Sequence, residues 1–267
     1  MSMRTNPVKR KLREGQPSFG TWLSLGDLYA TRVLARAGFD WLTLDIEHSA
    51  IDWSQAAMIF ACVADAGGVP LARVPKGNHD YIKRVLDAGA WGIVVPMVDT
   101  VEQATIAIRA AKYPPVGNRS LGGGMHAMNF GTNSAEYYKK ANDEILVILQ
   151  TESPTGVANA EQIYALPGVD GIFVGPVDLR ANMRSPDGKE ASDDEFEAML
   201  ARVVAAGKKT GTATGMHTMD PQAALARAKQ GMQFIAVGSD LRMMTLKAQE
   251  VQRTLYPSGS EKDLAAY

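Results

Sequence analysis

Residues 19–53 read FGTWLSLGDLYATRVLARAGFDWLTLDIEHSAIDW and contain one strand–helix–strand unit. Two apolar runs, FGTWLSL at 19–25 and WLTLDIE at 41–47, flank the amphipathic segment YATRVLARAG at 29–38. Short runs rich in branched and aromatic residues predict buried strands, whereas apolar residues three or four positions apart predict a helix. A glycine at the end of such a segment is typical of a helix C-terminus. The stretch therefore predicts a βαβ unit.

The same alternation continues along the rest of the chain. The further apolar runs are PLARVP (70–75), GIVVPM (92–97), ILVILQTE (145–152), GIFVGP (171–176), TATGMH (212–217) and QFIAVGS (233–239). Eight βα units are the number that closes a TIM barrel, so we predict an α/β fold with a single (β/α)8 barrel domain over residues 1–267. A doubly wound open sheet is the alternative that periodicity leaves open. Residues 253–267 are expected to form a C-terminal tail.

The composition excludes several classes of protein. The chain of 267 residues is 46% hydrophobic and 21% charged with a net charge of −1, so neither nucleic acid nor a membrane surface is predicted as a partner. No apolar run approaches the ~18 residues of a membrane span, and the charged N-terminus lacks the apolar core of a secretory signal. The single Cys62 favours a reducing compartment, and we expect a cytoplasmic protein. The basic cluster Lys9, Arg10, Lys11 and Arg13 predicts a solvated helix face.

Charged and polar side chains gather at the carboxyl ends of the predicted strands. In a (β/α)8 barrel the catalytic residues lie at this end, so we expect these side chains to share one site. They are Asp45, Glu47, His48, Arg73, Gln150, Glu152 and Asp178.

Glu152 and Asp178 are the candidate metal ligands. Two carboxylates from neighbouring strand ends, with no Cys and no His-x-His nearby, suit a hard divalent cation such as Mg²⁺ or Mn²⁺. The structural alternative is that one carboxylate is a helix N-cap, since Ser153-Pro154 after Glu152 resemble a helix start, and that the other forms a salt bridge at the rim.

His48 and Arg73 are the candidate catalytic residues. An Asp45 carboxylate that accepts the imidazole N–H would make His48 a general base. Arg73 would place a permanent cation in the same mouth, where it could hold a carboxylate or a developing enolate. Each has a structural alternative, because His48 could bond to a loop and Arg73 could pair with Asp45 or Glu47.

Other histidines and a glycine-rich segment complete the candidates. The segment GNRSLGGGMH (117–126) predicts an adaptable loop over the barrel mouth, which makes His126 a candidate, and it lacks the Lys-Ser/Thr of a P-loop. His217 closes the seventh run, whereas His79 is expected at a helix start. No lysine except Lys76 follows an apolar run, so a Schiff-base mechanism is poorly supported.

Four motifs occur together: D-x-E-H at 45–48, V-P-M at 95–97, Q-T-E at 150–152 and G-P-x-D-L at 175–179. The chain carrying them resembles the HpcH/HpaI family of class II, metal-dependent 2-keto-3-deoxy acid aldolases, from about residue 6 to residue 255. The resemblance implies a (β/α)8 barrel that assembles as a homo-hexamer, often with the last helix swapped between paired subunits. It also implies reversible cleavage of a 4-hydroxy-2-keto acid to pyruvate and an aldehyde through a metal-stabilised enolate.

The resemblance assigns roles to the residues at the strand ends. It implies that Glu152 and Asp178 ligate Mg²⁺, Mn²⁺ or Co²⁺. It further implies that His48, paired with Asp45, is the acid/base and that Arg73 contacts the pyruvate enolate.

The resemblance also implies substrate contacts. Gln150 is expected near the substrate, and backbone amides around Val177 and Asp178 are expected to hold the pyruvate carboxylate. The loop at 117–126 departs from the family pattern but keeps Arg119, so Arg119 and His126 are expected near the acceptor aldehyde. The alternative is the related citryl/malyl-CoA lyase chemistry, which needs an adenine-nucleotide site for which the sequence offers no clear basic patch.

Overall fold

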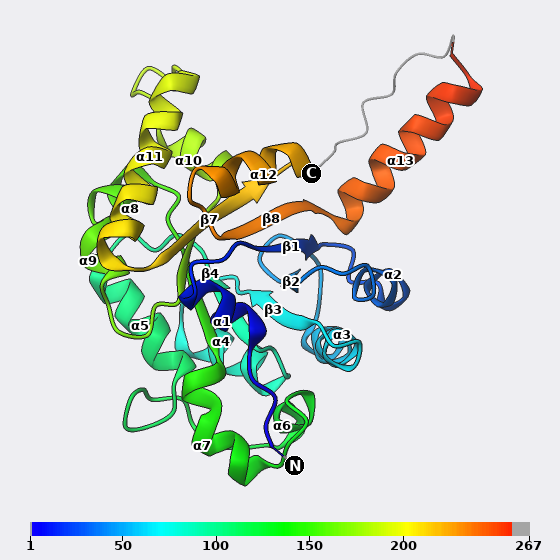
Figure 1. Ribbon diagram of the computed structural model, residues 1–267, viewed down its shortest axis with the longest axis vertical. Helices are drawn as coiled ribbons and strands as arrows, with labels where there is room; N and C mark the ends of the chain where they lie inside the picture. Colours follow the sequence, from blue (N-terminus) through cyan, green and yellow to red (C-terminus); the bar gives the residue numbers. More distant parts are fainter. Residues whose placement is uncertain (1, 258–267) are drawn as a thin grey trace.

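Eight parallel strands close into one barrel in the computed structural model, which describes residues 2–257 (Figure 1). Each strand pairs with the next one along the chain, and β8 pairs with β1 to complete the ring. The strands are β1 (Ser18–Leu23), β2 (Trp41–Asp45), β3 (Val69–Arg73), β4 (Gly92–Val95), β5 (Leu146–Gln150), β6 (Gly171–Val174), β7 (Ala213–Thr218) and β8 (Phe234–Ser239). The closed ring confirms the predicted (β/α)8 barrel and excludes the open sheet.

Helices surround the barrel, and several follow the strand ends directly. They are α1 (Pro7–Arg13), α2 (Leu28–Leu34), α3 (Trp53–Asp65), α4 (His79–Asp87), α5 (Val101–Ala111), α6 (Met125–Asn129), α7 (Ser134–Glu144), α8 (Pro154–Ala158), α9 (Ala160–Tyr164), α10 (Pro176–Asn182), α11 (Asp193–Thr210), α12 (Pro221–Lys229) and α13 (Asp240–Leu255). Capping boxes at Thr100–Gln103 and Ser192–Glu195 define the starts of α5 and α11. No helix of the described chain is long and apolar enough to cross a bilayer.

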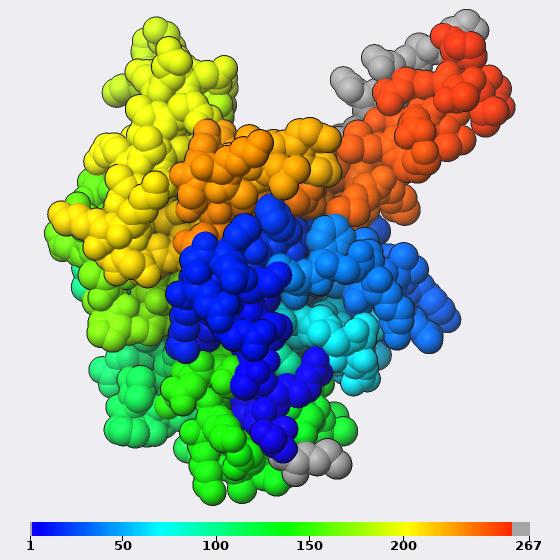
Figure 2. Space-filling model, viewed as in Figure 1, coloured from blue at the N-terminus to red at the C-terminus, as the bar shows by residue number. Residues whose placement is uncertain are grey.

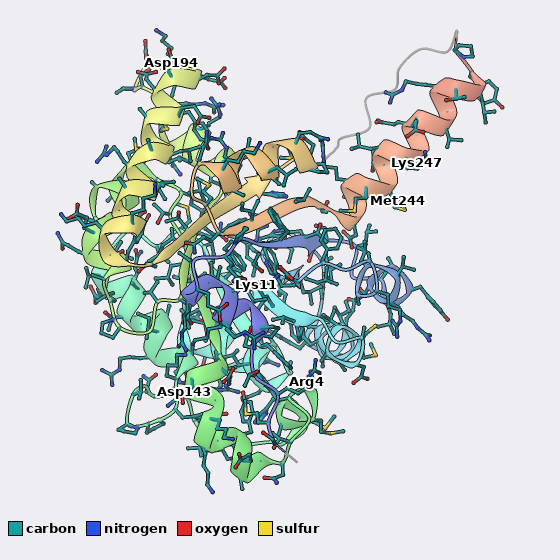
Figure 3. The ribbon with its side chains drawn as sticks, in the orientation of Figure 1. Arg4, Lys11, Asp143, Asp194, Met244 and Lys247 are labelled. Carbon is teal, nitrogen blue, oxygen red and sulfur yellow. The ribbon has the colours of Figure 1, made fainter. Side chains whose placement is uncertain are left out.

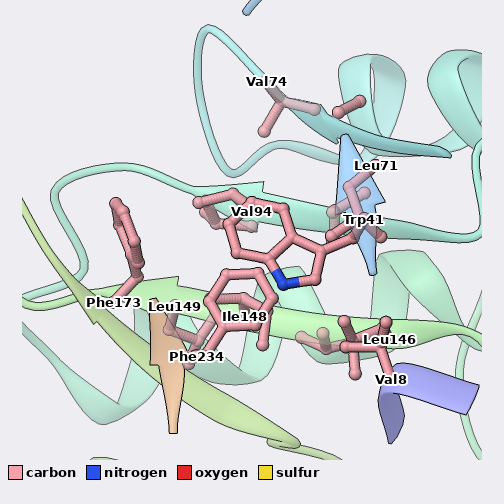
Figure 4. Packing of buried hydrophobic residues seen from close by; sticks show 14 of the residues in the cluster. Val8, Trp41, Leu71, Val74, Val94, Leu146, Ile148, Leu149, Phe173 and Phe234 are labelled. Carbon is pink, nitrogen blue, oxygen red and sulfur yellow. The ribbon is translucent and has the colours of Figure 1, made fainter. Parts of the chain in front are cut away.

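Aromatic rings pack among Val, Leu and Ile side chains in the buried core (Figure 4). The Trp41 ring of β2 stacks on the Phe234 ring of β8, with centroids 4.1 Å apart and an interplanar angle of 9°. A Cβ atom at Gly20 of β1 would lie only 2.1 Å from the Trp41 ring, so the barrel needs glycine at that position. The barrel interior is therefore a packed core and not a channel.

The lower end of the barrel, where the strands begin, is covered by α1. The predicted solvated face is wrong for Lys9, which is 4% exposed and forms an ion pair with Asp170 at 3.0 Å. Its ammonium group also donates to the carbonyl of Ile145, at the start of β5. Lys11 pairs with Asp40 on the same side. Part of the basic cluster therefore fixes α1 to the barrel.

Helix α13 projects from the barrel as an arm (Figures 1 and 2). Asp240 is its only buried residue, and Met244 and Lys247 lie on the projecting part (Figure 3). Residues 253–255 of the expected tail continue this helix, and residues 258–267 lie outside the described part of the chain.

Candidate active site

A small pocket of about 60 Å³ opens at the carboxyl ends of the strands. Six of its lining residues are those expected from the sequence: Asp45, His48, Arg73, Gln150, Val177 and Asp178. The others are Trp22, Ser24, Phe173, Gly175, Pro176, His217 and Ser239. The barrel therefore brings together residues from seven strand ends, those of β1, β2, β3, β5, β6, β7 and β8.

Asp45 and Arg73 form a buried, two-pronged ion pair. Arg73 Nε donates to Asp45 Oδ1 at 3.0 Å, and Arg73 Nη2 donates to Asp45 Oδ2 at 2.6 Å. Asp45 Oδ1 also accepts the backbone N–H groups of Glu47 and His48. Both carboxylate oxygens are thus occupied, so the predicted pairing of Asp45 with the His48 ring is not found. The guanidinium fork matches a carboxylate better than a single imidazole N–H does.

Glu47 lies between Arg73 and His48. Its Oε2 atom is 3.3 Å from Arg73 Nε and 3.7 Å from His48 Nε2. Burial raises the pKa of Glu47 to about 7, although the charge of Arg73 opposes this rise. The His48 side chain is 48% exposed and lies at the rim, where it can reach both water and a substrate. Glu47 is therefore the carboxylate that can orient the His48 ring.

Glu152 is held by two donors at the end of β5. The backbone N–H of Met97 donates to its Oε1 at 2.7 Å, and Gln150 Nε2 donates to its Oε2 at 2.6 Å. Met97 has a φ of 52°, a left-handed conformation that is energetically costly for a residue with a side chain. This conformation occurs at the residue whose N–H group donates to Glu152. Burial raises the pKa of Glu152 to about 7, and the neighbouring charge of Asp178 adds to the rise.

Glu152 and Asp178 lie close enough to act on one ion. A Cβ atom at Gly175 would lie 2.3 Å from Glu152 Oε2 and 3.5 Å from Asp178 Oδ2, so these oxygens are no more than about 5.8 Å apart. Glycine at 175 leaves this space open. Gln150 Oε1 is buried beside it without a hydrogen-bond partner. Two carboxylates and an unpartnered amide oxygen fit a hard cation that takes its remaining ligands from water and substrate.

Within residues 2–257, no group of three or more His, Cys, Asp or Glu side chains is arranged to hold a metal. A cation at this position would therefore have two protein carboxylates, which is the usual arrangement for Mg²⁺ in enzymes that bind it together with substrate oxygens.

Three rings, those of Trp22, Phe173 and His217, form an aromatic part of the pocket wall. The Trp22 ring stacks between Phe173, at 5.1 Å and 17°, and His217, at 5.7 Å and 20°. The Arg73 guanidinium lies 5.7 Å from the Trp22 ring centroid. The sequence pattern gave Trp22 and Phe173 no role, although their position near the strand ends was a signal that could have found them.

Arg119 and His126 do not lie in this pocket. Arg119 is fully buried, pairs with Asp87 at 2.7 Å and donates to the Tyr137 hydroxyl. His126 is fully buried against the Tyr137 ring, with centroids 4.4 Å apart. Asp87 precedes β4, so both residues lie near the strand starts, at the end of the barrel opposite to the pocket. The expected position of the 117–126 segment over the mouth is therefore wrong within a single chain.

The fold and the pocket define an α/β-barrel enzyme with acidic and basic groups at the carboxyl ends of its strands. The chain belongs to the HpcH/HpaI aldolase/citrate lyase family, whose profile matches residues 18–245. Membership of this family makes the protein a carbon–carbon lyase.

Individual relatives cover nearly the whole chain. A Paraburkholderia phytofirmans protein named hydroxypyruvate/pyruvate aldolase is 39% identical over 251 residues, covering 91% of this chain and 95% of its own. A Klebsiella pneumoniae protein named 2-keto-3-deoxy-L-rhamnonate aldolase is 37% identical over 243 residues, covering 90% of each chain. The crystal structure of a Burkholderia cenocepacia member of the family superimposes with a TM-score of 0.86 at 36% identity, covering 94% of this chain and 99% of the other.

Proposed function

We propose that the protein is a metal-dependent class II aldolase that reversibly cleaves a 4-hydroxy-2-keto acid to pyruvate, or a closely related 2-keto acid, and an aldehyde. The observation that carries the proposal is the pair Glu152, buried after β5, and Asp178, half-buried after the neighbouring β6, beside the unpartnered oxygen of Gln150. The names of the two relatives, which refer to pyruvate, hydroxypyruvate and a 2-keto-3-deoxy acid, support the same class of substrate.

The pocket suits a small 2-keto acid. The pocket has a volume of about 60 Å³, whereas one water molecule requires about 10–15 Å³ on the same measure. The pocket therefore has room for a molecule the size of pyruvate. No side chain caps the start of α10, so the backbone amides of Val177 and Asp178 remain available for a carboxylate. The substrate's carboxylate would accept from these amides. A divalent cation, Mg²⁺, Mn²⁺ or Co²⁺, held by Glu152 and Asp178 would supply positive charge to the keto end of the substrate.

Arg73 is arranged to stabilise the negative charge of an enolate. Its Nε and Nη2 atoms are committed to Asp45, whereas Nη1 has no hydrogen-bond partner in the described part of the chain. The fixed fork therefore leaves Nη1 free to donate to the oxygen that becomes charged when the C3–C4 bond breaks. Such preorganised donors are usually worth about 10²–10³ in turnover.

His48 is the group best placed to move the proton. In cleavage it would take the proton of the 4-hydroxyl as the C3–C4 electron pair passes to the enolate, and the aldehyde would leave at the rim. A proton then adds to C3 to give pyruvate. Glu47, 3.7 Å from His48 Nε2, would stabilise the imidazolium that forms. This assignment replaces the expected Asp45–His48 pair.

The alternative is cleavage of a CoA thioester, as in the citryl/malyl-CoA lyases. Such a substrate carries an adenine nucleotide that needs a basic surface beside the pocket. Arg73 is the one Lys or Arg side chain among the residues that line the pocket, and its contacts hold it inside. The aldolase is therefore the better-supported activity.

The test is incubation with pyruvate and simple aldehydes, in parallel with acyl-CoA substrates, before and after chelation with EDTA. We expect aldol product that EDTA abolishes and that Mg²⁺ or Mn²⁺ restores. Activity that survives chelation, or turnover of acyl-CoA alone, would contradict the proposal. Borohydride with pyruvate should label no lysine, since a covalent adduct would indicate a Schiff-base aldolase.

We also propose that the chain assembles with further copies, as the resemblance to hexameric aldolases implies. An apolar groove of about 560 Å³ lies beside the base of α13. Its walls include Phe19, Phe39, Leu225 and Val237. The exposed apolar side chains of the projecting α13, such as Met244 and Val251, match the character of this groove.

A further inference from the structure

His217 ends up inside the pocket, and the proposed reaction gives it no role. It belongs to β7 and lines the same pocket as Asp45, His48 and Arg73. Its ring is stacked on the indole of Trp22, with centroids 5.7 Å apart. The ring is therefore fixed in orientation beside the reacting groups.

The environment of His217 selects one tautomer. His217 Nε2 is 3.0 Å from the backbone carbonyl oxygen of Gly238, which can only accept, so Nε2 carries the proton. Burial lowers the pKa of His217, and the charge of Arg73 lowers it further, so the ring is neutral at neutral pH. Nδ1 then carries a lone pair and is a hydrogen-bond acceptor.

The carbonyl of Gly238 is turned toward His217 by a bulge in β8. The register between β1 and β8 shifts between Gly20 and Trp22, and Gly238 adopts a φ of +57°, which favours glycine. The Thr21 hydroxyl donates to the same carbonyl at 3.2 Å. The orientation of His217 is thus built into the barrel, and the carbonyl keeps a partner if the histidine is replaced.

His217 Nδ1 has no hydrogen-bond partner among residues 2–257. The atom is also accessible, because it is absent from the buried atoms that lack a partner. We propose that His217 is a specificity residue whose Nδ1 accepts a hydrogen bond from a hydroxyl group of the substrate. The inference rests on the proposed aldolase function and deepens it, because a hydrogen bond to His217 Nδ1 would favour hydroxylated substrates over alkyl ones. The hydroxyl belongs to the 2-keto acid or to the aldehyde, and the two sources are separable by experiment.

The test compares matched substrate pairs in the wild type and in His217→Phe, which keeps a flat ring against Trp22 but removes both nitrogens. One pair is hydroxypyruvate and pyruvate with a common aldehyde, and the other is glycolaldehyde and acetaldehyde with pyruvate. We expect the ratio of kcat/KM, hydroxylated over unhydroxylated, to fall about tenfold in one pair, as for the loss of one hydrogen bond. The pair that responds identifies the source of the hydroxyl.

Two further variants separate recognition from structure. His217→Gln keeps a donor for Gly238 and an acceptor for the substrate, so it should restore most of the ratio. His79→Phe is the matched control, because His79 Nε2 also lies 3.0 Å from a backbone carbonyl, that of Asn118, but outside the pocket. Its ratio should equal that of the wild type.

Ratios unchanged by His217→Phe in both pairs would overturn the proposal, as would an equal change caused by His79→Phe. A wild type without aldol product in any combination would instead contradict the aldolase function. In that case calorimetric binding of hydroxypyruvate and pyruvate to the wild type and to His217→Gln and His217→Phe still tests His217. Equal relative affinities in all three would overturn the assignment to the 2-keto acid.

Discussion

Glu152 combines deep burial with two hydrogen-bond donors and forms no ion pair within residues 2–257. It is 2% exposed, and Asp178 adds a second negative charge to its surroundings. Burial therefore raises its pKa from the ordinary 4.5 to about 7. A carboxylate that the fold keeps partly protonated until a cation arrives is a reasonable ligand for that cation, because the metal reverses the cost of ionising it.

This pKa predicts how stability depends on pH in the chelated protein. A carboxyl group whose pKa is higher in the folded state stabilises the fold below pH 4.5, and this stabilisation is lost as the pH rises through about 7. Glu152→Gln removes the titration. We therefore expect the free energy of unfolding of the wild type, relative to Glu152→Gln, to fall on the order of 2 kcal/mol between pH 5 and pH 8. Urea unfolding in EDTA measures it, and a difference that is constant or rises with pH would contradict the raised pKa.

The sequence predicted which residues line the pocket better than how they pair. Their place after strand-like runs was enough to locate Asp45, Arg73, Gln150 and Asp178 at one end of the barrel. Asp45 and Arg73 are also neighbours in the β2–β3 register, which places the two side chains side by side. Register depends on the closure of the whole barrel, which a single strand does not encode. The strand sequences therefore could not decide between the expected Asp45–His48 pair and its alternative, the Asp45–Arg73 pair that the structure shows.

At the scale of elements, the insertion at residues 113–131 shows why Arg119 and His126 were misplaced. The segment follows α5, and a helix in such a barrel runs from the strand ends back to the strand starts. An insertion after a helix therefore lies at the lower end, whereas one after a strand lies at the mouth. The residues directly after β6, from Gly175 to Asp178 at the start of α10, do line the pocket. Loop length alone did not distinguish the two cases.

The buried position of Arg119 predicts a structural role. Its guanidinium pairs with Asp87 at 2.7 Å and lies 4.6 Å from the Tyr113 ring centroid. Arg119→Met should lower the free energy of unfolding by about 2–3 kcal/mol, since it leaves Asp87, which is partly exposed, without its partner. Arg109→Met on the exposed face of α5 is the control and should change stability by less than about 0.5 kcal/mol. Equal stability of the two variants in urea unfolding would show that the buried pair contributes nothing.

At the scale of the whole molecule, α13 projects from the barrel, and the rest of the chain does not cover its apolar side chains. Met244, Val251 and Leu255 are all exposed on the arm visible in Figure 2. Large apolar patches of this kind mark contacts between proteins. The number of copies was predicted only from the resemblance to the family, because a sequence pattern for one barrel does not encode how barrels pack.

The apolar groove gives a test of the assembly. Leu225→Arg places a charge on its wall, where burying it against another copy would cost several kcal/mol. We expect this variant to show a smaller mass than the wild type by light scattering after size-exclusion chromatography. Val116→Arg, an exposed apolar position outside the groove, is the control and should leave the mass unchanged. The same mass for all three proteins would mean that the groove is not an interface.

The central claim is that Glu152 and Asp178 hold the cation that enables enolisation of a 2-keto acid. The most direct measurement is deuterium exchange of the pyruvate methyl group in D2O, followed by NMR while Mn²⁺ or Mg²⁺ is added to the chelated protein. We predict that exchange rises to saturation with metal in the wild type and is at least about 10²-fold slower in Glu152→Ala and Asp178→Ala. Exchange at the full wild-type rate in EDTA would contradict the account. Metal-dependent exchange in both variants at the wild-type rate would contradict it as well.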